Sequence, residues 1–318
     1  MAITPVELLR SCPVLSDAPS TYLDNKMRNN FPYRWTAPSL IVILFAATAT
    51  AQSNLSATTA PTSKPALPTL WIIGDSTVRN GQDTGDNGQW GWGNPIASYF
   101  DKSKIRVVNA AYGGTSSRTF QTDPRFWPAV LTKIRPGDYL IMQFGHNDAG
   151  NPADPSRARA SLPGNGEDTT QIHNPLTNKD EIIHSYGWYL RKYVTDAQSK
   201  GAAMVIICTL IPRNHWTNAA VNPTADFTQW AQQAAEQAKV PCIDLNGLII
   251  KKYNALGEQV VTDTLFPAGE TTHTDWAGAV LNAQTVIEGM KTIDHCPIVD
   301  ALLANPPTNL KNPTGKPR

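Results

Sequence analysis

Ser76 is the first residue whose type and position could do chemistry. It closes the tripeptide Gly74-Asp75-Ser76, directly after an apolar run that predicts a buried strand. Ligands of open α/β sheets bind outside the carboxyl ends of the strands, so a serine at this point is a candidate nucleophile. Because Gly-Asp-Ser also occurs in ordinary turns, the motif needs support from the rest of the chain.

Groups that would support a serine nucleophile follow later apolar runs. Gly113 and Gly114 follow the second run, where a glycine N–H can approach a ligand closely. Asn147 follows the third run, and its amide can donate a hydrogen bond. His273, just before a predicted helix, is the candidate base, and His146 competes with it because it adjoins Asn147.

Each of these residues also has an ordinary structural interpretation. Gly113-Gly114 is typical of a turn, Asn147 of a cap, and a lone histidine such as His273 of a protein surface. A parallel sheet, however, brings the carboxyl ends of its strands to one edge. The combination therefore favours a shared site over separate structural roles.

The elements that must position these groups alternate between strands and helices. Continuous apolar strands separated by helices predict a parallel sheet covered on both faces. We expect an α/β fold, a three-layer α/β/α sandwich with a central five-stranded parallel sheet, over residues 69–295. The expected strands are 70–74, 106–111, 138–144, 202–210 and 240–245; a helix is expected to start near Asn94-Pro95, and others to cover 124–135, 182–200, 225–238, 246–256 and 276–292. Residues 149–180, rich in Pro, Gly, Asn and Asp, are expected to form a long functional loop.

The N-terminal residues have the layout of an export signal. Arginines precede the apolar run that begins after Pro38, and Ala49-Thr50-Ala51 offers a small-residue cleavage site. The alternative, a membrane anchor, is disfavoured because the run is shorter than the roughly 20 residues of a spanning helix. We expect an N-terminal extension and signal peptide at 1–51, with the signal at about 27–51 and Met27 as a candidate start. A disordered linker at 52–68 and a C-terminal tail at 296–318 complete the expected organisation.

Composition excludes several classes of partner. The net charge is +1, without a long basic block, so neither nucleic acid nor an anionic membrane surface is favoured. After signal cleavage we expect a secreted or periplasmic monomer without metal or cofactor, because no Cys or His cluster has zinc-ligand spacing. Cys208, Cys242 and Cys296 would remain, and the sequence does not select a disulfide pair among them.

The motifs together resemble the SGNH, or GDSL, hydrolase superfamily, and longer blocks resemble its rhamnogalacturonan acetylesterases of carbohydrate esterase family 12. This resemblance implies the flavodoxin-like SGNH hydrolase fold and covers residues 69 to 293. The blocks that carry it are Asn109 to Arg118, Phe144 to Asp148, Ser161 to Gly164, Tyr186 to Tyr193, Pro212 to Asn214, Thr272 to Thr274 and Ala277 to Ala279.

The resemblance implies a role for each residue that matches the family pattern. Ser76 matches the nucleophile and His273 the base. The Ser76 N–H, Gly114 and Asn147 match the oxyanion hole, with Gly113 one position away as the alternative to Gly114.

Glu270 departs from the family pattern, which has aspartate three residues before the histidine. A glutamate carboxylate can also orient an imidazole, although its extra methylene changes the reach. Asp263 and Asp275 are the alternatives if Glu270 points away.

The function that the resemblance implies is a secreted serine esterase acting on plant cell-wall polysaccharide. It would remove acetyl groups, most specifically from acetylated rhamnogalacturonan (pectin), through an acetyl-serine intermediate. The alternatives are an SGNH esterase acting on acetyl-xylan or small acyl esters, and a non-catalytic carbohydrate-binding protein on the same fold.

Aromatic and cationic side chains are candidates for binding the polysaccharide. Trp92 offers an aromatic face for a sugar, and Arg118 and Arg213 offer charges for uronic-acid carboxylates. Packing and surface solvation are the competing interpretations of these residues. Trp90, Trp216 and Lys192 are further candidates with the same competing interpretations.

Overall fold

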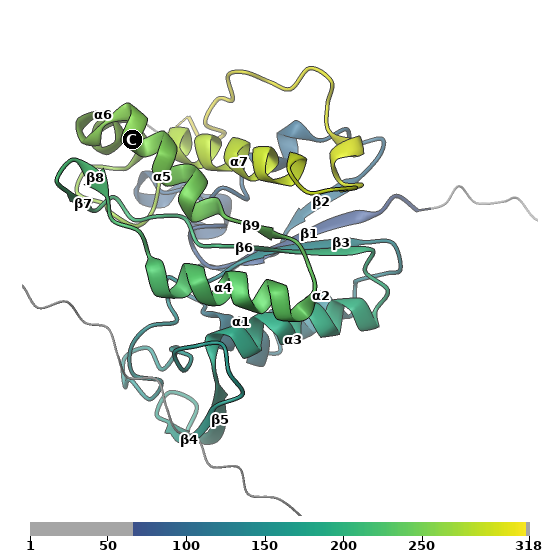
Figure 1. The fold of residues 1–318 in the computed structure, drawn as a ribbon, viewed down its shortest axis with the longest axis vertical. Coiled ribbons are helices and arrows are strands. Elements are labelled where there is room, and N and C mark those ends of the chain that lie inside the picture. The colour runs from purple at the N-terminus through teal and green to yellow at the C-terminus, as the bar shows by residue number, and fades with distance from the viewer. Residues whose placement is uncertain (1–65, 316–318) are drawn as a thin grey trace, which may run out of the picture. The chain divides into compact units, whose positions relative to one another are not determined.

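The computed structural model describes residues 66–315, so the expected signal peptide and most of the expected linker lie outside the described residues. Five parallel strands form the central sheet in the order β2-β1-β3-β6-β9, which confirms the predicted sheet (Figure 1). The strands are β1 Thr69–Gly74, β2 Arg106–Asn109, β3 Tyr139–Gln143, β6 Met204–Cys208 and β9 Cys242–Ile243. Two antiparallel pairs lie outside this sheet: β4 Thr169–Asn174 with β5 Lys179–His184, and β7 Trp216–Thr217 with β8 Ala220–Val221.

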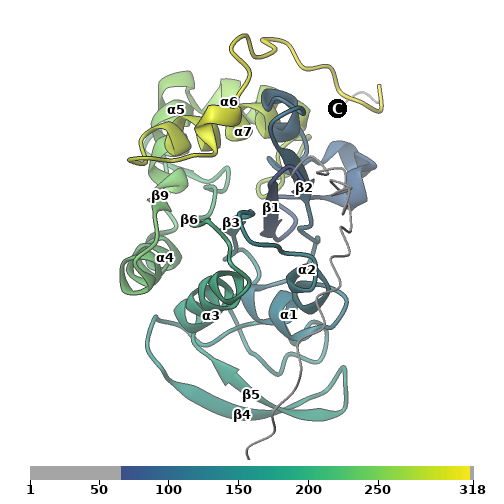
Figure 2. The ribbon, with the colours of Figure 1, turned by 90° about the vertical axis from the view of Figure 1, so that its right-hand side faces the viewer.

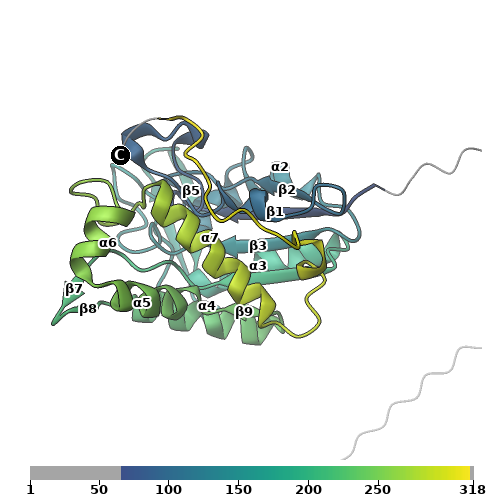
Figure 3. The ribbon, with the colours of Figure 1, turned by 90° about the horizontal axis from the view of Figure 1, so that it is seen from above.

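Helices cover both faces of the sheet, as the alternation predicts (Figures 1 and 3). Side chains of one strand point alternately to the two faces, so β1 contributes Leu70 and Ile72 to one core and Trp71 and Ile73 to the other. The first core packs against α5 Leu245–Leu256, α6 Glu258–Leu265 and α7 Trp276–Lys291, and the second against α1 Ser117–Thr122, α2 Trp127–Leu131, α3 Tyr186–Ser199 and α4 Ala225–Ala238.

The strand order decides where the candidate residues meet. Along the chain the sheet strands have the flavodoxin-like order 2-1-3-4-5, whose switch point lies between β1 and β3. Ser76 follows β1 and Asn147 follows β3, so both lie at this crevice. The last position of β1 needs a glycine, because a Cβ on Gly74 would lie 2.4 Å from the carbonyl oxygen of Gln143.

Most predicted elements are confirmed, with shifted ends, while several details are wrong. The helix at 225–238 has the predicted bounds. The helix expected near Pro95 is only a 3-10 turn, Ile96–Tyr99, and the one expected at 124–135 is shorter, Trp127–Leu131. The helices α1 and α6 and the hairpin β4–β5 are not anticipated. Figure 2 shows this hairpin outside α1 and α3, on the side away from the sheet.

The C-terminal segment that we expect as a fraying tail packs on the domain instead. Ile298 is fully buried, and Leu302 forms a β-bridge with Phe100. Further along, the Leu310 carbonyl accepts a hydrogen bond of 2.7 Å from the Trp276 indole at the start of α7. Residues 296–310 are therefore part of the fold.

Two further observations concern the described part of the chain. Within residues 66–315, no helix is both long and apolar enough to cross a bilayer. The three cysteines of this part, Cys208, Cys242 and Cys296, are free thiols, and two of them are buried.

Candidate active site

Ser76, His273 and Glu270 form one hydrogen-bonded chain. Ser76 Oγ lies 2.9 Å from His273 Nε2, and His273 Nδ1 lies 3.1 Å from Glu270 Oε2. A carboxylate can only accept, so His273 Nδ1 carries the proton and donates it to Glu270. Nε2 is then the acceptor for the Ser76 hydroxyl, which is the arrangement of a base poised to take the serine proton.

The loop before α7 holds Glu270 as an ionised carboxylate. Its Oε1 accepts hydrogen bonds from the N–H groups of Thr271 and Thr272, at 2.9 and 2.7 Å, and its Oε2 accepts one from the Gln89 amide at 2.7 Å. Burial alone would raise the pKa of Glu270, but the hydrogen bonds from Thr272 and His273 outweigh it and lower that pKa. Both carboxylate oxygens of the longer glutamate side chain are therefore hydrogen-bonded.

The two alternatives to Glu270 have other positions. Asp275 caps the N-terminus of α7, where its Oδ1 accepts from the Gly278 N–H at 2.9 Å. Asp263 lies on α6 and accepts from the Gln259 amide at 2.6 Å. Geometry therefore places Glu270, and neither of these aspartates, against His273.

The glycine-rich loop of residues 81–93 is hydrogen-bonded to the loop that carries His273. The Trp90 N–H donates to the Thr274 carbonyl at 2.8 Å, and the Thr274 hydroxyl donates back to the Trp90 carbonyl at 3.0 Å. The Trp90 ring packs edge-on against Trp276, with centroids 5.0 Å apart. These contacts fix His273 relative to Ser76 although 197 residues separate them.

The expected oxyanion donors follow three neighbouring strands. Gly114 has a φ of +84°, which a glycine adopts without strain. Within residues 66–315, neither the Ser76 N–H nor the Gly114 N–H donates a hydrogen bond to the protein. One proton of the Asn147 amide goes to the Thr115 carbonyl at 2.8 Å, which orients the side chain and leaves its second proton. A Cβ on Gly113 would lie 3.6 Å from the Ser76 Cβ, so this loop runs directly beside the serine.

His146, the competing base, lies in a different environment. Both of its ring nitrogens are shielded from solvent. Burial is the main cause that lowers the pKa of His146 to about 4, so its imidazole is neutral at physiological pH. Because the hydrogen bond of Ser76 goes to His273, the structure favours His273 as the base.

Trp92 is a core residue, so the prediction that it binds substrate is wrong. Its side chain has no exposed surface, and its indole N–H donates to Gln143 inside the sheet at 2.8 Å. Trp90 is 1% exposed and packs against Trp276. Trp216 is partly exposed, and its indole N–H is bonded to Asn214. Packing is the correct interpretation of the first two tryptophans.

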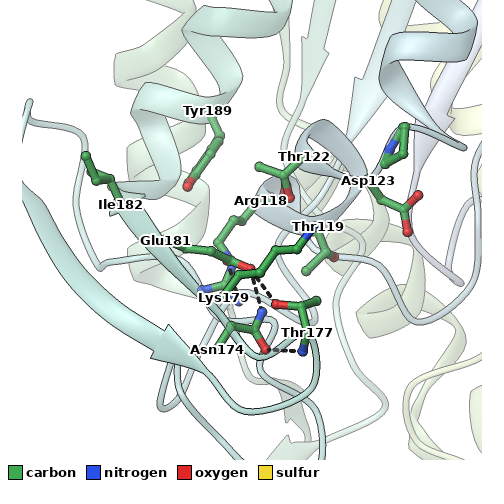
Figure 4. Close-up of a pocket in the computed structure, with 11 residues that line it drawn as sticks. Arg118, Thr119, Thr122, Asp123, Asn174, Thr177, Lys179, Glu181, Ile182 and Tyr189 are labelled. Atoms are coloured by element: carbon green, nitrogen blue, oxygen red, sulfur yellow. Dashed lines mark hydrogen bonds and ion pairs between the residues drawn. The ribbon is translucent and has the colours of Figure 1, made fainter.

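Arg118 is also buried, at 1% exposure, and the prediction that it meets a substrate carboxylate is wrong. Its guanidinium donates to the carbonyls of Pro152 and Ala158 and faces Glu181 at 3.9 Å. Arg118 belongs to α1, and Figure 4 shows it beside Glu181 of β5, at a cavity of about 490 Å³. Arg118 therefore holds protein segments together.

The two other predicted cations lie apart from each other. Arg213 donates to the Thr272 hydroxyl and, at 3.4 Å, to the His146 carbonyl, so it joins the loops on either side of the serine. Lys192 pairs with Asp196 along α3. Arg213 alone of the predicted cations is therefore both partly exposed and beside the triad.

Several residues of the site escape prediction from sequence. Gln89, which binds Glu270, carries no signal except its place in a glycine-rich loop. Arg157 and Arg159 line a cavity beside Asn147, and only their place in the long loop after β3 points to them. Within residues 66–315 no group of three His, Cys, Asp or Glu side chains is arranged to hold a metal ion.

Comparisons with known proteins show the family of the chain. Residues 72–281, more than half of the chain, match the model of the GDSL-like Lipase/Acylhydrolase family. The chain is 29% identical over 224 residues to a rhamnogalacturonan acetylesterase of Emericella nidulans, covering 70% of this chain and 84% of that protein. It is 30% identical over 238 residues to YesY of Bacillus subtilis, described as a probable rhamnogalacturonan acetylesterase, covering 74% and 97%.

Among solved structures, protein YXIM of Bacillus subtilis shares the fold, with a TM-score of 0.55 and 26% identity. The match covers 71% of this chain and 56% of that one, so the chain spans just over half of YXIM. The family match extends from the second half of β1 to the first turns of α7, so Ser76, Glu270 and His273 all lie within the matched residues. The chain therefore belongs to the GDSL-like lipase/acylhydrolase family, the SGNH hydrolases, and is a carboxylic ester hydrolase.

Proposed function

We propose that this esterase is exported and removes acetyl groups from acetylated rhamnogalacturonan through an acetyl-serine intermediate. The observation that carries the proposal is the continuous hydrogen-bonded chain from Ser76 through His273 to Glu270 at the carboxyl edge of the sheet. Two relatives named for rhamnogalacturonan deacetylation support the substrate. The signal-like layout of residues 27–51 supports export.

Acylation begins when Ser76 Oγ attacks the acetyl carbonyl carbon and His273 Nε2 takes the hydroxyl proton. The carbonyl oxygen becomes an oxyanion, and the N–H groups of Ser76 and Gly114 and the amide of Asn147 stabilise it. Glu270 stabilises the imidazolium that forms. The tetrahedral intermediate then collapses: the bond to the sugar oxygen breaks, and that oxygen takes the proton from His273.

Deacylation repeats the same steps with water. His273 takes a proton from a water molecule, whose oxygen attacks the acetyl-serine carbonyl carbon. The same donors stabilise the second oxyanion. When the bond to Ser76 Oγ breaks, His273 returns the proton to the serine and acetate leaves. Because both steps use one base and one oxyanion hole, a single loss in the triad affects both.

The test measures acetate release from acetylated rhamnogalacturonan, acetyl-xylan and an aryl acetate, with wild type beside Ser76→Ala. We expect serine-dependent release that is fastest on the pectic polymer, and mass spectrometry of a quenched reaction should find an acetyl group on Ser76. Release by Ser76→Ala at the wild-type rate would refute the mechanism. Serine-dependent release that is fastest on acetyl-xylan, or restricted to the aryl ester, would refute the substrate and keep the mechanism.

A further inference from the structure

A second cavity, of about 290 Å³, opens beside the proposed oxyanion hole. It is lined by His146 and Asn147 on one side and by the loop after β3, including Arg157 and Arg159, on the other. A group bound in this cavity would therefore lie next to an acetyl group bound at Ser76. Nothing in the triad mechanism uses this space.

Positive charge dominates the cavity. Within residues 66–315, neither Arg157 nor Arg159 has a carboxylate within ion-pair distance. The acidic residue in the lining is Asp154, whose Oδ1 already accepts from the Ser156 hydroxyl and from the N–H groups of Ser156 and Arg157. Arg157 and Arg159 thus line a space in which the one carboxylate of the lining is engaged in a turn.

Arg159 reaches from this cavity to the backbone beside the nucleophile. Its Nη1 donates to the Gly114 carbonyl at 2.9 Å, and Gly113 is the residue whose Cβ would lie 3.6 Å from Ser76. Partial burial is the main cause that lowers the pKa of Arg159, and the neighbouring Arg157 contributes in the same direction. Asp75 and Asp148 act in the opposite direction. A guanidinium stays charged under such a shift, and a bound anion would offset the repulsion between the two arginines.

The backbone between the two arginines is held in a strained conformation. Ala158 is 2% exposed and has a φ of +40°, in the left-handed region that residues other than glycine rarely adopt. Its carbonyl accepts a hydrogen bond from the buried Arg118, which also binds Pro152. Such strain persists only where the surroundings hold it, so Arg118 acts as a positioning residue for the arginine pair.

We propose that Arg157 and Arg159 form a carboxylate subsite that binds a uronic acid residue of the polysaccharide beside the acetyl group to be removed. The planar fork of a guanidinium matches a carboxylate with two parallel hydrogen bonds, which a neutral sugar does not offer. The inference rests on the proposed function and adds the group that the enzyme recognises. It explains how a single site would prefer an acidic acetylated polymer to a neutral one such as acetyl-xylan.

Binding of a matched pair of probes to the inactive Ser76→Ala chain tests the subsite. One probe is a rhamnogalacturonan oligosaccharide with free carboxylates, and the other is the same oligosaccharide as its methyl ester. By calorimetry we expect the free acid to bind about tenfold more tightly, the usual order for one charge-assisted pair. Adding Arg157→Gln or Arg159→Gln should remove most of this preference, whereas Arg135→Gln, an exposed arginine at the opposite edge of the sheet, should keep it.

Equal binding of the two probes by the Ser76→Ala chain would overturn the subsite, and so would binding of neither. A preference that survives both arginine substitutions would also overturn it. Arg159→Gln removes the bond to Gly114 and could disturb the loop, so Arg157→Gln, whose exposed side chain makes no hydrogen bond within residues 66–315, provides the independent test.

The subsite and the proposed function can fail separately. Acetate release from rhamnogalacturonan by the wild type, with equal binding of the two probes, keeps the function and rejects the subsite. Absence of that release, with a carboxylate preference that Arg157→Gln abolishes, rejects the proposed substrate reaction and keeps the subsite.

Discussion

The loops that carry the triad and the segment 149–184 beside them are stabilised in different ways. The triad loops, residues 75–80, 89–92 and 269–275, bond to one another across most of the chain, as Gln89 does to Glu270 and Trp90 to Thr274. The segment 149–184 is held largely by its own hairpin and by a few arginines that enter it from helices, such as Arg118 from α1 and Arg191 from α3.

With the proposed function, this difference predicts that catalysis and substrate recognition depend on separate regions of the molecule. The triad loops set the distances among reacting groups, and a small displacement there changes the rate for every substrate. The segment 149–184 adds surface and charge around those groups, so a change there should alter which substrate binds. Substitutions in the triad loops and at the strand end after β3 should lower kcat, and those in the segment should mainly raise KM.

The largest effect in this comparison is expected from Asn147→Ala. Loss of one oxyanion donor typically costs about 3 kcal/mol in the transition state, so kcat should fall about 100-fold or more. The loss should be equal for the polymer and for an aryl acetate, because both pass through the same oxyanion. A decrease confined to the polymer would show that Asn147 belongs to recognition.

Gln89→Leu should have a smaller effect of the same kind. It removes one of the donors to Glu270 and leaves the N–H groups of Thr271 and Thr272. We expect kcat to fall roughly tenfold, the usual order for the loss of one hydrogen bond to an ionised group. Gln259→Leu, the same substitution at an exposed position on α6, is the control. Steady-state kinetics on an aryl acetate measures both, and equal rates for the two variants would argue against a role of Gln89.

Arg118→Met tests the other side of the comparison. Methionine keeps much of the buried volume but leaves the carbonyls of Pro152 and Ala158 without their donor, so the loop that carries Arg157 should lose its fixed conformation. We expect KM for the acidic polymer to rise several-fold, on the order of one lost hydrogen bond, and more than kcat falls. A loss of kcat with an unchanged KM would contradict the separation of roles.

His146→Gln has the smallest expected effect at neutral pH and acts on stability. The folded protein depresses the pKa of His146 from 6.5 to about 4, so the neutral form is favoured by the fold. Its contribution to stability is therefore present above pH 6.5 and is lost as the pH falls towards 4. Urea unfolding across this range should show a weaker acid destabilisation for the variant.

Asp148 affects the pH dependence of stability in the opposite direction over nearly the same pH range, because burial raises the pKa of Asp148 from 3.8 to about 6. It is present in both proteins, so the difference between wild type and variant isolates His146. Parallel stability curves for the two proteins between pH 4 and 6.5 would contradict the buried neutral imidazole.

Ser76 and His273 could be predicted from sequence because each adjoins a strong local signal. Ser76 follows an apolar strand, and His273 precedes the capped helix α7. The role of Glu270, which stands where the family pattern has aspartate, could be assigned only from the structure, because only the loop geometry shows that Glu270 reaches the imidazole. A sequence identifies which residues end a strand more readily than how far a side chain extends.

The errors concern residues whose partners lie far away in the sequence. Arginine is usually a surface residue, yet Arg118 is buried because the carbonyls of Pro152 and Ala158 accept hydrogen bonds from its guanidinium. The hairpin strand Thr169–Asn174 is polar and mostly exposed, so it lacks the apolar alternation that marks a strand. Trp92 illustrates the converse, since an aromatic in a glycine-rich loop can equally belong to the core.

The C-terminal segment has a consequence for biosynthesis. Ser76 is made early and His273 late, and within residues 66–315 the still later Leu310 bonds to Trp276, just after the loop that carries His273. During translation the sheet can begin to form long before these residues emerge, because domains assemble as their chain becomes available. We therefore expect hydrolysis only after His273 has emerged and folded against Ser76, because a shorter translation product would contain the serine without the imidazole proposed to activate it.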